Sequence, residues 1–300
     1  MTGAAQVSTI DVVTERGRFA TMSAAPLTTV RGWVLLIPGF TGSKEDFEPI
    51  LPLLAAAGWQ AVAYDQRGQY QTPGGYAASY TLEALASDAL SIADAVAPTK
   101  GRHLVGHSFG GLVAQAAALQ APQTWQSVML VCSGPGGFRT RPEANSLRSF
   151  AELVGIAPLE AVYEARLSDD RRRGRRAPAP EAAAFQRARF SANAPECLRA
   201  MAQLLIDAPD RVVEVAALGL PVAVVRGADD DAWSHAVQGE MAARLGASVG
   251  VVPDSAHSPA VENPPEMARR LITFLTATEE SALALDERAY RVRDQLDSDR

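Results

Sequence analysis

The chain has 300 residues, more than one layered core usually needs and fewer than two large domains would fill, so we expect one domain with an insertion. Hydrophobic residues make up 47% and charged residues 21% of the sequence, a balance typical of a soluble globular protein that excludes disorder as its main state. The formal net charge of -6 gives no electrostatic reason to bind nucleic acid or an anionic membrane surface, so neither is expected as a partner.

Cysteine usage and hydropathy set further limits. The two cysteines, Cys132 and Cys197, cannot build a disulfide framework or a four-thiolate zinc site. The N-terminus lacks the basic start and apolar core of a secretory signal, and the most apolar stretch, residues 51–64, is interrupted and shorter than the roughly 20 residues that cross a bilayer. We therefore expect a cytoplasmic protein without a membrane span, a metal ion or a cofactor.

Short apolar runs alternate with longer amphipathic segments along most of the chain, and Gly, Pro, Ser or Asp residues mark the changes. A hairpin is predicted first, at residues 7–13 and 18–23. The later strands are predicted at residues 33–37, 60–64, 103–105, 127–131, 221–226 and 247–252, and the helices at residues 46–57, 81–96, 110–120 and 265–277. This alternation predicts an α/β fold with a mostly parallel central sheet flanked by helices.

Residues 132–220 break the alternation, because they contain four helix-like stretches and no convincing strand. We interpret residues 134–218 as a helical cap inserted into a core formed by residues 1–133 and 219–278. Residues 279–300 form a charged extension in which a few apolar residues suggest one further helix with a frayed end.

The clearest chemical motif is the segment Gly-His-Ser-Phe-Gly at residues 106–110, between the predicted strand at 103–105 and the predicted helix at 110–120. The serine of such a Gly-x-Ser-x-Gly pattern lies on a tight strand-to-helix turn, where side chains at the flanking positions would clash with neighbouring backbone. The start of the helix directs N–H groups toward negative charge that develops beside the serine. We predict that Ser108 is a nucleophile; a chance Gly/Ser turn is the alternative.

A serine hydroxyl needs a base to accept its proton, and His257 is the best placed of the four histidines. It lies in a loop after the predicted strand at residues 247–252, which should end at the same edge of the sheet as Ser108. His103 starts its strand at the opposite edge and is expected to be structural, and His107 is expected to pack beside the nucleophile. A surface role is the alternative for His257.

A carboxylate should orient the imidazole of that base, and the segment after the predicted strand at residues 221–226 supplies Asp229, Asp230 and Asp231. The chain order of serine, acid and histidine is the one expected for this arrangement, so one of the three should serve. Capping of the following helix is the alternative for this cluster.

Two backbone N–H groups are predicted to stabilise a developing oxyanion. Phe40 lies in the Gly-rich turn after the predicted strand at residues 33–37, and Phe109 follows Ser108 at the start of its helix. An ordinary Gly-rich connector is the alternative for the first of these turns.

Together these residues resemble the α/β-hydrolase superfamily over about residues 30–131 and 221–275. The segments that carry the resemblance are residues 38–39, 65–68, 106–110, 227–230 and 257–264. The family places its acid three positions after the glycine found here as Gly227, which implies Asp230. The family's alternative position for the acid corresponds to residues 132–134, which contain no carboxylate.

Two segments depart from the usual family pattern. Many members have His-Gly where this chain has Pro38-Gly39, and the usual Gly-x-Gly-x-Ser corresponds here to Gly-Gln-Tyr-Gln-Thr at residues 68–72. Both departures leave the serine, histidine and acid in place. They imply that the polar contacts around the Phe40 turn differ from those of common esterases.

The resemblance implies a serine esterase- or lipase-like enzyme that cleaves a carboxylic ester, thioester or lactone of a small apolar acyl substrate through an acyl-enzyme. Acyl transfer to another acceptor and carbon–carbon bond hydrolysis use the same residues, and a small-molecule receptor is the alternative outside enzymology. The insertion would act as a lid, with Phe138 and Trp233 at the substrate pocket, although its aromatic residues could instead form only its own core. The arginine run at residues 171–176 is interpreted as a solvated loop, and the oligomeric state is not predicted.

Overall fold

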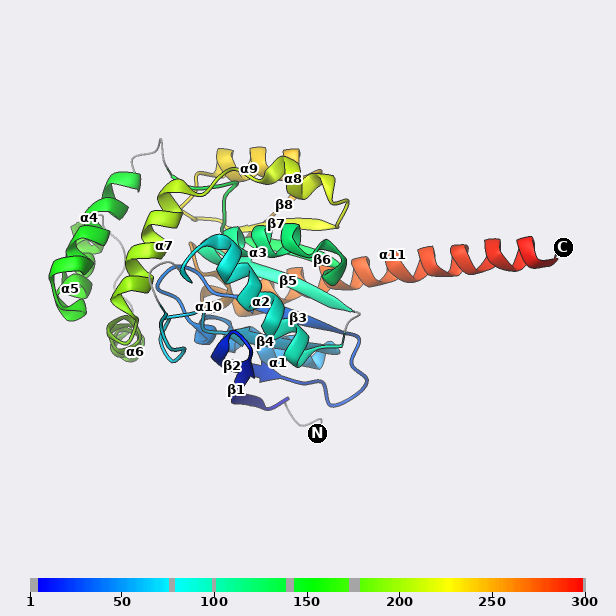
Figure 1. Ribbon diagram of the computed structural model, residues 1–300, viewed down its shortest axis with the longest axis horizontal. Helices are drawn as coiled ribbons and strands as arrows, with labels where there is room; N and C mark the ends of the chain where they lie inside the picture. The colour runs from blue at the N-terminus through cyan, green and yellow to red at the C-terminus, as the bar shows by residue number, and fades with distance from the viewer. Residues whose placement is uncertain (1–4, 76–78, 99–100, 139–142, 173–178, 299–300) are drawn as a thin grey trace.

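The computed structural model describes residues 5–75, 79–98, 101–138, 143–172 and 179–298, with side chains as far as residue 284 (Figure 1). The described residues form an eight-stranded sheet in the order β1-β2-β4-β3-β5-β6-β7-β8. Its strands are β1 (Val7–Thr14), β2 (Gly17–Ala24), β3 (Gly32–Ile37), β4 (Trp59–Tyr64), β5 (Arg102–His107), β6 (Ser127–Val131), β7 (Val222–Gly227) and β8 (Val249–Val252). The β1–β2 hairpin and the β2–β4 pair are antiparallel, and every other pair is parallel. The predicted α/β fold is confirmed.

The register of the two central strands brings together the turns that follow them. β3 and β5 are parallel neighbours in which Leu36 pairs with Val105 and Ile37 pairs with Gly106. Both strands are buried along nearly their whole length, as expected for a parallel sheet that helices cover on both faces. Because parallel strands end at one edge of the sheet, the turn after Ile37 and the turn after His107 begin side by side.

Helices pack on both faces of the sheet. They are α1 (Leu51–Ala56), α2 (Leu82–Val96), α3 (Phe109–Gln120), α8 (Val212–Ala217), α9 (His235–Arg244), α10 (Pro259–Glu262) and α11 (Pro264–Ser298), with the 3-10 helices η1 (Lys44–Ile50) and η3 (Pro122–Thr124). Successive strand residues face opposite sides, so Leu35 belongs to the buried cluster with α2, α3, α8 and α9. Its neighbour Leu36 belongs to the cluster with α1 and α11.

The single helix expected at residues 46–57 is wrong, because the structure divides this segment into η1 and α1. Pro49 lies inside η1 and Pro52 lies in the first turn of α1. Proline has no N–H group to donate and its ring clashes with the preceding turn of an α-helix, so a continuous helix cannot form here.

Four helices follow β6 where the sequence predicts a helical insertion. They are α4 (Glu143–Ile156), α5 (Leu159–Arg172), α6 (Pro180–Ser191) and α7 (Pro195–Asp207), and they gather at one end of the molecule in Figure 1. Val154, Leu159, Tyr163, Phe190 and Leu198 form a buried cluster of their own among these helices. Of the arginine run at residues 171–176, only the first two arginines fall within the described residues, where they end α5 as exposed side chains.

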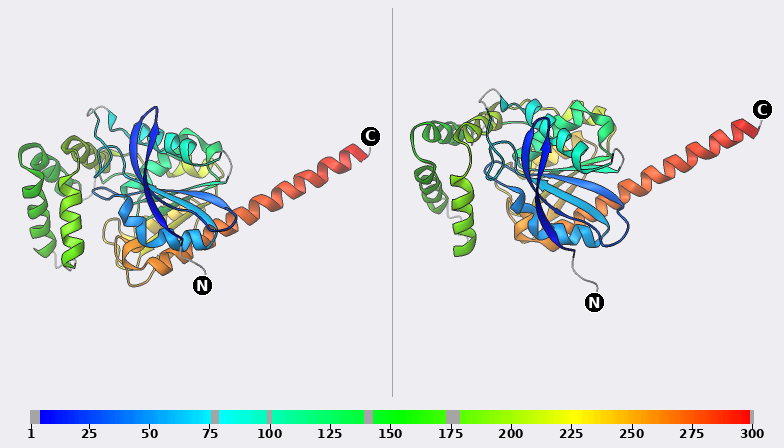
Figure 2. Two further views of the ribbon diagram at one scale, coloured as in Figure 1. Left: turned by 90° about the horizontal axis from the view of Figure 1, so that it is seen from below. Right: turned by 60° about the horizontal axis from the view of Figure 1, so that its bottom comes forward.

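The last helix is longer than the sequence suggests. The helix expected at residues 265–277 continues without a break to Ser298 as α11, so no separate helix follows residue 279. Its first part is anchored by buried Met267, Leu271 and Leu275, and its second part projects away from the body (Figures 1 and 2). Among the described residues, no helix combines the length and apolar character that crossing a bilayer requires.

Candidate active site

Ser108 lies on a strained turn between β5 and α3. Its backbone has φ 54° and ψ -120°, a conformation that residues other than glycine rarely adopt. A Cβ atom at Gly106 would lie 2.3 Å from the carbonyl oxygen of Gly110, and one at Gly110 would lie 2.3 Å from that of Ile37. Only glycine therefore fits at the positions two residues before and two residues after the serine, which explains the spacing of the motif.

The end of β6 also holds this turn. The Ser108 N–H group donates to the carbonyl oxygen of Val131 at 2.8 Å, and the buried Ser133 hydroxyl donates to the Ser108 carbonyl oxygen at 2.8 Å. These contacts fix the backbone of Ser108 from the neighbouring strand, so its side chain has a defined direction.

His257 joins Ser108 to an acid. It lies in the loop between β8 and α10, and its Nε2 atom is 2.9 Å from the Ser108 hydroxyl oxygen. Its Nδ1 atom is 2.8 Å from Oδ1 of Asp230, which follows β7. With Nδ1 protonated, Nε2 has a free lone pair for the serine proton. Three segments far apart in the sequence thus form one hydrogen-bonded chain.

Of the three consecutive aspartates, only Asp230 is buried, whereas Asp229 and Asp231 are exposed. Burial alone would raise the pKa of the Asp230 carboxyl. The hydrogen bond and charge of His257, together with donors from the Ala232 N–H group and Gln238, outweigh burial and hold this pKa below its usual value. Asp230 is therefore ionised at neutral pH, as an acceptor for the Nδ1 proton requires.

Gln238 was missed in the sequence because nothing in a local motif marks it. It lies on α9, fully buried, and its Nε2 atom donates to Oδ2 of Asp230 at 2.8 Å and to the carbonyl oxygen of Trp233 at 2.9 Å. The available signal was periodicity, because Gln238, Met241 and Ala242 share the buried face of α9. A polar residue on such a face requires a buried partner.

The two predicted amide donors adjoin the serine. Phe109 is the first residue of α3, where a backbone N–H group has no acceptor within the helix. Phe40 follows Gly39, at which a Cβ atom would lie 3.0 Å from the Cβ of Ser108. Both residues thus lie beside Ser108, and their role as oxyanion donors stays a prediction.

Phe138 and Trp233 are brought together, but in the core. Their rings stack with centroids 4.5 Å apart, and their side chains are 5% and 1% exposed. A role at the substrate pocket stays a prediction for both residues.

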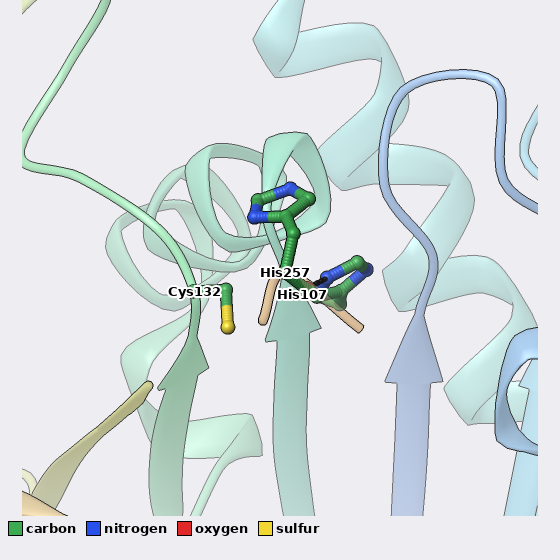
Figure 3. Close-up of side chains that lie close together, drawn as sticks. All are labelled: His107, Cys132 and His257. Atoms are coloured by element: carbon green, nitrogen blue, oxygen red, sulfur yellow. Dashed lines mark hydrogen bonds between the residues drawn. The ribbon is translucent and has the colours of Figure 1, made fainter. Parts of the chain in front are cut away.

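A further cluster surrounds the histidine. Figure 3 shows His257 with His107, at the end of β5, and Cys132, directly after β6. The Nε2 atom of His107 is 2.6 Å from the carbonyl oxygen of His257. Burial, followed by the nearby charge of His257, lowers the pKa of His107 to about 4, so at neutral pH it is an uncharged donor that anchors the His257 loop.

The same cluster is the group in the described residues whose donor atoms could hold a metal ion, since the donors of His107, Cys132 and His257 lie within 4.8 Å of one another. An ion would have to displace a hydrogen bond of His257, because both of its ring nitrogens have partners. Burial also raises the pKa of the Cys132 thiol well above its usual value, which disfavours the thiolate that a metal needs. The cluster suits hydrogen bonding better than metal binding.

Comparisons with known proteins agree with this architecture. The sequence model of the alpha/beta hydrolase family matches residues 34–270. A protein of Variovorax paradoxus with the provisional name carbamate hydrolase RutD is 38% identical over 123 residues, which cover 41% of this chain and 44% of that protein. The uncharacterized hydrolase YugF of Bacillus subtilis is 31% identical over 112 residues, which cover 37% of this chain and 40% of that protein. The matches thus span less than half the length of these curated relatives.

Two solved structures share the fold over nearly the whole chain. A carboxylesterase structure from Nitrososphaera gargenis has a TM-score of 0.75 at 22% identity, with 91% of this chain and 100% of that chain covered. The enol-lactonase from Burkholderia xenovorans has a TM-score of 0.74 at 19% identity, with 89% of this chain and 100% of that chain covered. At such identities the likeness supports the fold alone.

Proposed function

Because the chain belongs to the alpha/beta hydrolase family, we propose that it is a serine hydrolase that cleaves a carboxylic ester, thioester or lactone through an acyl-enzyme. The observation that carries this proposal is the continuous chain of hydrogen bonds from Asp230 through His257 to Ser108 on its strained turn. A serine held in this way is activated by a base whose orientation is fixed by an acid.

The proposed reaction has two halves. His257 takes the proton of Ser108 as Oγ attacks the substrate carbonyl carbon, and Asp230 stabilises the imidazolium that forms. The N–H groups of Phe40 and Phe109 hold the oxyanion, and His257 then gives its proton to the leaving alcohol or thiol. In the second half His257 deprotonates a water molecule, which attacks the carbonyl carbon of the acyl-enzyme. The bond from that carbon to Oγ of Ser108 breaks, His257 returns the proton to Oγ, and the acid is released.

The test is the Ser108→Ala variant, assayed with p-nitrophenyl acetate and labelled with a fluorophosphonate. We expect the rate to fall about 10³-fold or more and the label to disappear. Ser87→Ala, a serine on the outer face of α2, is the matched control and should keep both. Unchanged hydrolysis by a folded Ser108→Ala protein would exclude the proposal.

The site leaves two properties of the reaction open: the acceptor of the acyl group and the type of bond that is cleaved. Acyl transfer, carbon–carbon bond hydrolysis and carbamate hydrolysis would all use attack on a carbonyl by the same serine. The carbamate named in relatives such as that of Variovorax paradoxus adds this class to the candidates. A series of p-nitrophenyl esters of increasing chain length, assayed with and without added alcohol, separates hydrolysis from acyl transfer by the products. A p-nitrophenyl carbamate and a β-diketone assayed in parallel test the carbamate and carbon–carbon bond reactions.

We also propose that residues 134–218 form a lid over this site. In support, two arginines of this region reach the turn that contains Phe40: Arg166 donates to the Thr41 hydroxyl at 2.8 Å, and Arg189 donates to the Ser43 hydroxyl at 3.3 Å. Arg189 also pairs with Asp46 of η1 at 2.5 Å. The inner face of the lid would then select the acyl group. A cytoplasmic location remains our proposal and is favoured by the two cysteines, which are free and buried.

A further inference from the structure

The loop that follows β4 donates side-chain hydrogen bonds to the turn that contains Phe40. We call residues 38–44 the oxyanion loop and residues 65–72 the β4 loop. The Gln66 side chain donates to the carbonyl oxygen of Pro38 at 2.9 Å, and the Gln69 side chain donates to that of Gly39 at 2.9 Å. These two loops contain the two segments in which the sequence departs from the family pattern.

The β4 loop also holds the far end of the oxyanion loop through a buried ion pair. Asp65 accepts the Lys44 N–H group at 2.8 Å and lies 3.0 Å from the Lys44 ammonium. Both side chains are fully buried. The oxyanion loop is therefore fixed by side chains at both of its ends.

The bond from Gln69 has a consequence that the others lack. A trans peptide is planar, and its C=O and N–H groups point in opposite directions. The carbonyl of Gly39 and the N–H group of Phe40 belong to the same peptide. A donor that holds the Gly39 oxygen from behind therefore fixes the direction of the Phe40 N–H group in front.

The same bond also changes the strength of the Phe40 donor. The Gly39 oxygen accepts two hydrogen bonds, from Gln69 and from the Gly42 N–H group at 3.1 Å. Hydrogen bonds to the carbonyl of a peptide polarise it and strengthen donation by its N–H group, most of all where water is excluded. Gln69 is completely buried, so nothing screens this effect.

The side-chain amide of Gln69 is itself oriented. Its Oε1 atom accepts the Gln66 N–H group at 3.2 Å, which leaves Nε2 to face Gly39. Met201 of α7 closes the other side, with its sulfur 3.8 Å from Nε2. Gln69 thus has one available arrangement, with its donor directed at the oxyanion loop.

We propose that Gln69 is a positioning residue that aims and polarises the Gly39–Phe40 peptide, so that the Phe40 N–H group is a strong oxyanion donor. The inference rests on the proposed function of Ser108 and concerns how its transition state is stabilised. Gln66 is the natural comparison, because it is equally buried but holds the preceding peptide.

The test compares Gln69→Met with Gln66→Met in the full-length chain. Each change keeps the length of the side chain and removes a donor that forms a buried hydrogen bond of 2.9 Å. Gln69→Met also removes the acceptor of the Gln66 N–H group, so it should cost more stability, and both variants are compared at a temperature at which each is folded. Reaction with p-nitrophenyl dimethylcarbamate, carbon-13 labelled at its carbonyl, gives a carbamoyl-enzyme that hydrolyses slowly. The infrared stretch of the labelled carbonyl then reports the strength of the hydrogen bonds to its oxygen.

We expect the carbonyl band of Gln69→Met to move to higher frequency, while Gln66→Met keeps the band of the unmodified protein. For p-nitrophenyl acetate, kcat of Gln69→Met should fall roughly ten-fold with KM little changed, less than the loss of about 10²–10³-fold when an oxyanion donor is removed outright. If Gln69→Met does not fold, Gln69→Leu also lacks the donor and carries no charge, and it should show the same shift.

Identical bands and rates in the Gln69 and Gln66 variants would overturn the inference and leave the chemistry of Ser108 intact. Failure of the unmodified protein to form any carbamoyl- or acyl-enzyme would instead overturn the proposed function, and the inference with it.

Discussion

Gln238 holds the side of Asp230 that faces away from the histidine. Its Nε2 atom donates to Oδ2 at 2.8 Å, while Oδ1 accepts from His257 at 2.8 Å. A carboxylate with both oxygens engaged cannot rotate, and each donor stabilises its charged form. The acid of the candidate site is therefore oriented by a residue that lies eight positions away on α9.

Replacing Gln238 should lower activity although Ser108, His257 and Asp230 all remain in place. In Gln238→Met we expect the pKa of Asp230 to rise, because burial is then opposed by fewer donors. Activity should fall roughly ten-fold at neutral pH, as loss of one hydrogen bond to a charged group predicts, and its decline in acid should begin at a higher pH. A pH–rate profile with p-nitrophenyl acetate measures both effects.

Gln203→Met is the matched control, because Gln203 also pairs with an aspartate on a helix but lies exposed on α7. Its profile should coincide with that of the unmodified protein. A Gln238→Met profile with the same shape and height would show that Asp230 does not need this donor.

The difference between Ser108 and Gln238 shows what the sequence can predict. Ser108 was identifiable because its function requires a local backbone geometry, and flanking glycines at Gly106 and Gly110 mark that geometry in the sequence itself. His257 could be chosen because strand order places its loop at the correct edge of the sheet. Local composition did not separate Asp230 from its two neighbours, and the family resemblance was needed.

The missed residues act through contacts between segments far apart in the chain. Gln69 and Gln238 are polar residues whose importance comes from burial against a partner, and no local pattern encodes that partner. The division of residues 46–57 into two helices was within reach of the sequence, since Pro49 and Pro52 were visible. The length of α11 was not, because charged residues past 279 are compatible with either helix or coil.

The ion pair between Lys44 and Asp65 should be a major determinant of stability. Both side chains are completely buried, so Lys44→Met leaves an unpaired carboxylate in the interior and should lower the free energy of unfolding by about 3–5 kcal/mol. The double variant Lys44→Met with Asp65→Asn removes both charges but keeps an amide oxygen that can accept the Lys44 N–H group, so it should lose much less. Urea unfolding of the three proteins measures the difference.

The same pair makes a prediction about pH. Burial raises the pKa of Asp65 despite its contacts with Lys44, and without the lysine the pKa should rise further. A carboxyl with a raised pKa in the folded state binds protons more tightly than in the unfolded state, so acid stabilises it. The loss in Lys44→Met should therefore be smaller at pH 5 than at pH 8; an equal loss at both would contradict a buried, unpaired carboxylate.

Gly227 should be essential for the position of His257. A Cβ atom there would lie 1.9 Å from the carbonyl oxygen of Ala256 and 2.5 Å from that of Ser255, and both are backbone atoms that cannot move aside alone. Gly227→Ala should push the His257 loop away and lower kcat for p-nitrophenyl acetate by about 10²-fold, the loss expected for a displacement of about 1 Å.

Gly239→Ala on α9 is the control, since a Cβ atom there meets nothing within 4 Å. It should keep full activity and gain about 0.5–1 kcal/mol of stability, because alanine is the better helix former. Comparable activity in both alanine variants would show that the His257 loop tolerates the displacement.

Two buried histidines should make the fold sensitive to acid. Burial lowers the pKa of His103 to about 4, and burial together with the charge of His257 lowers that of His107 to about 4 as well. An unfolded histidine takes up its proton near its ordinary value of about 6.5, so between these values the unfolded state binds more protons and stability falls as pH falls. As the pH falls from about 6.5 to about 4, each histidine should lower the free energy of unfolding by about 3 kcal/mol.

His103 offers the cleaner test, because it lies far from the candidate site and its Nδ1 atom has one partner, the Ser127 hydroxyl at 2.8 Å. The double variant His103→Phe with Ser127→Ala removes both partners of this buried bond, so its stability at pH 7 should change little. Its unfolding free energy should decline less steeply than that of the unmodified protein between pH 6.5 and pH 4.5. Urea titration at several pH values measures both declines. Parallel declines would mean that His103 is protonated equally easily in the folded and unfolded states, which would contradict the effect expected from its burial beside Trp59.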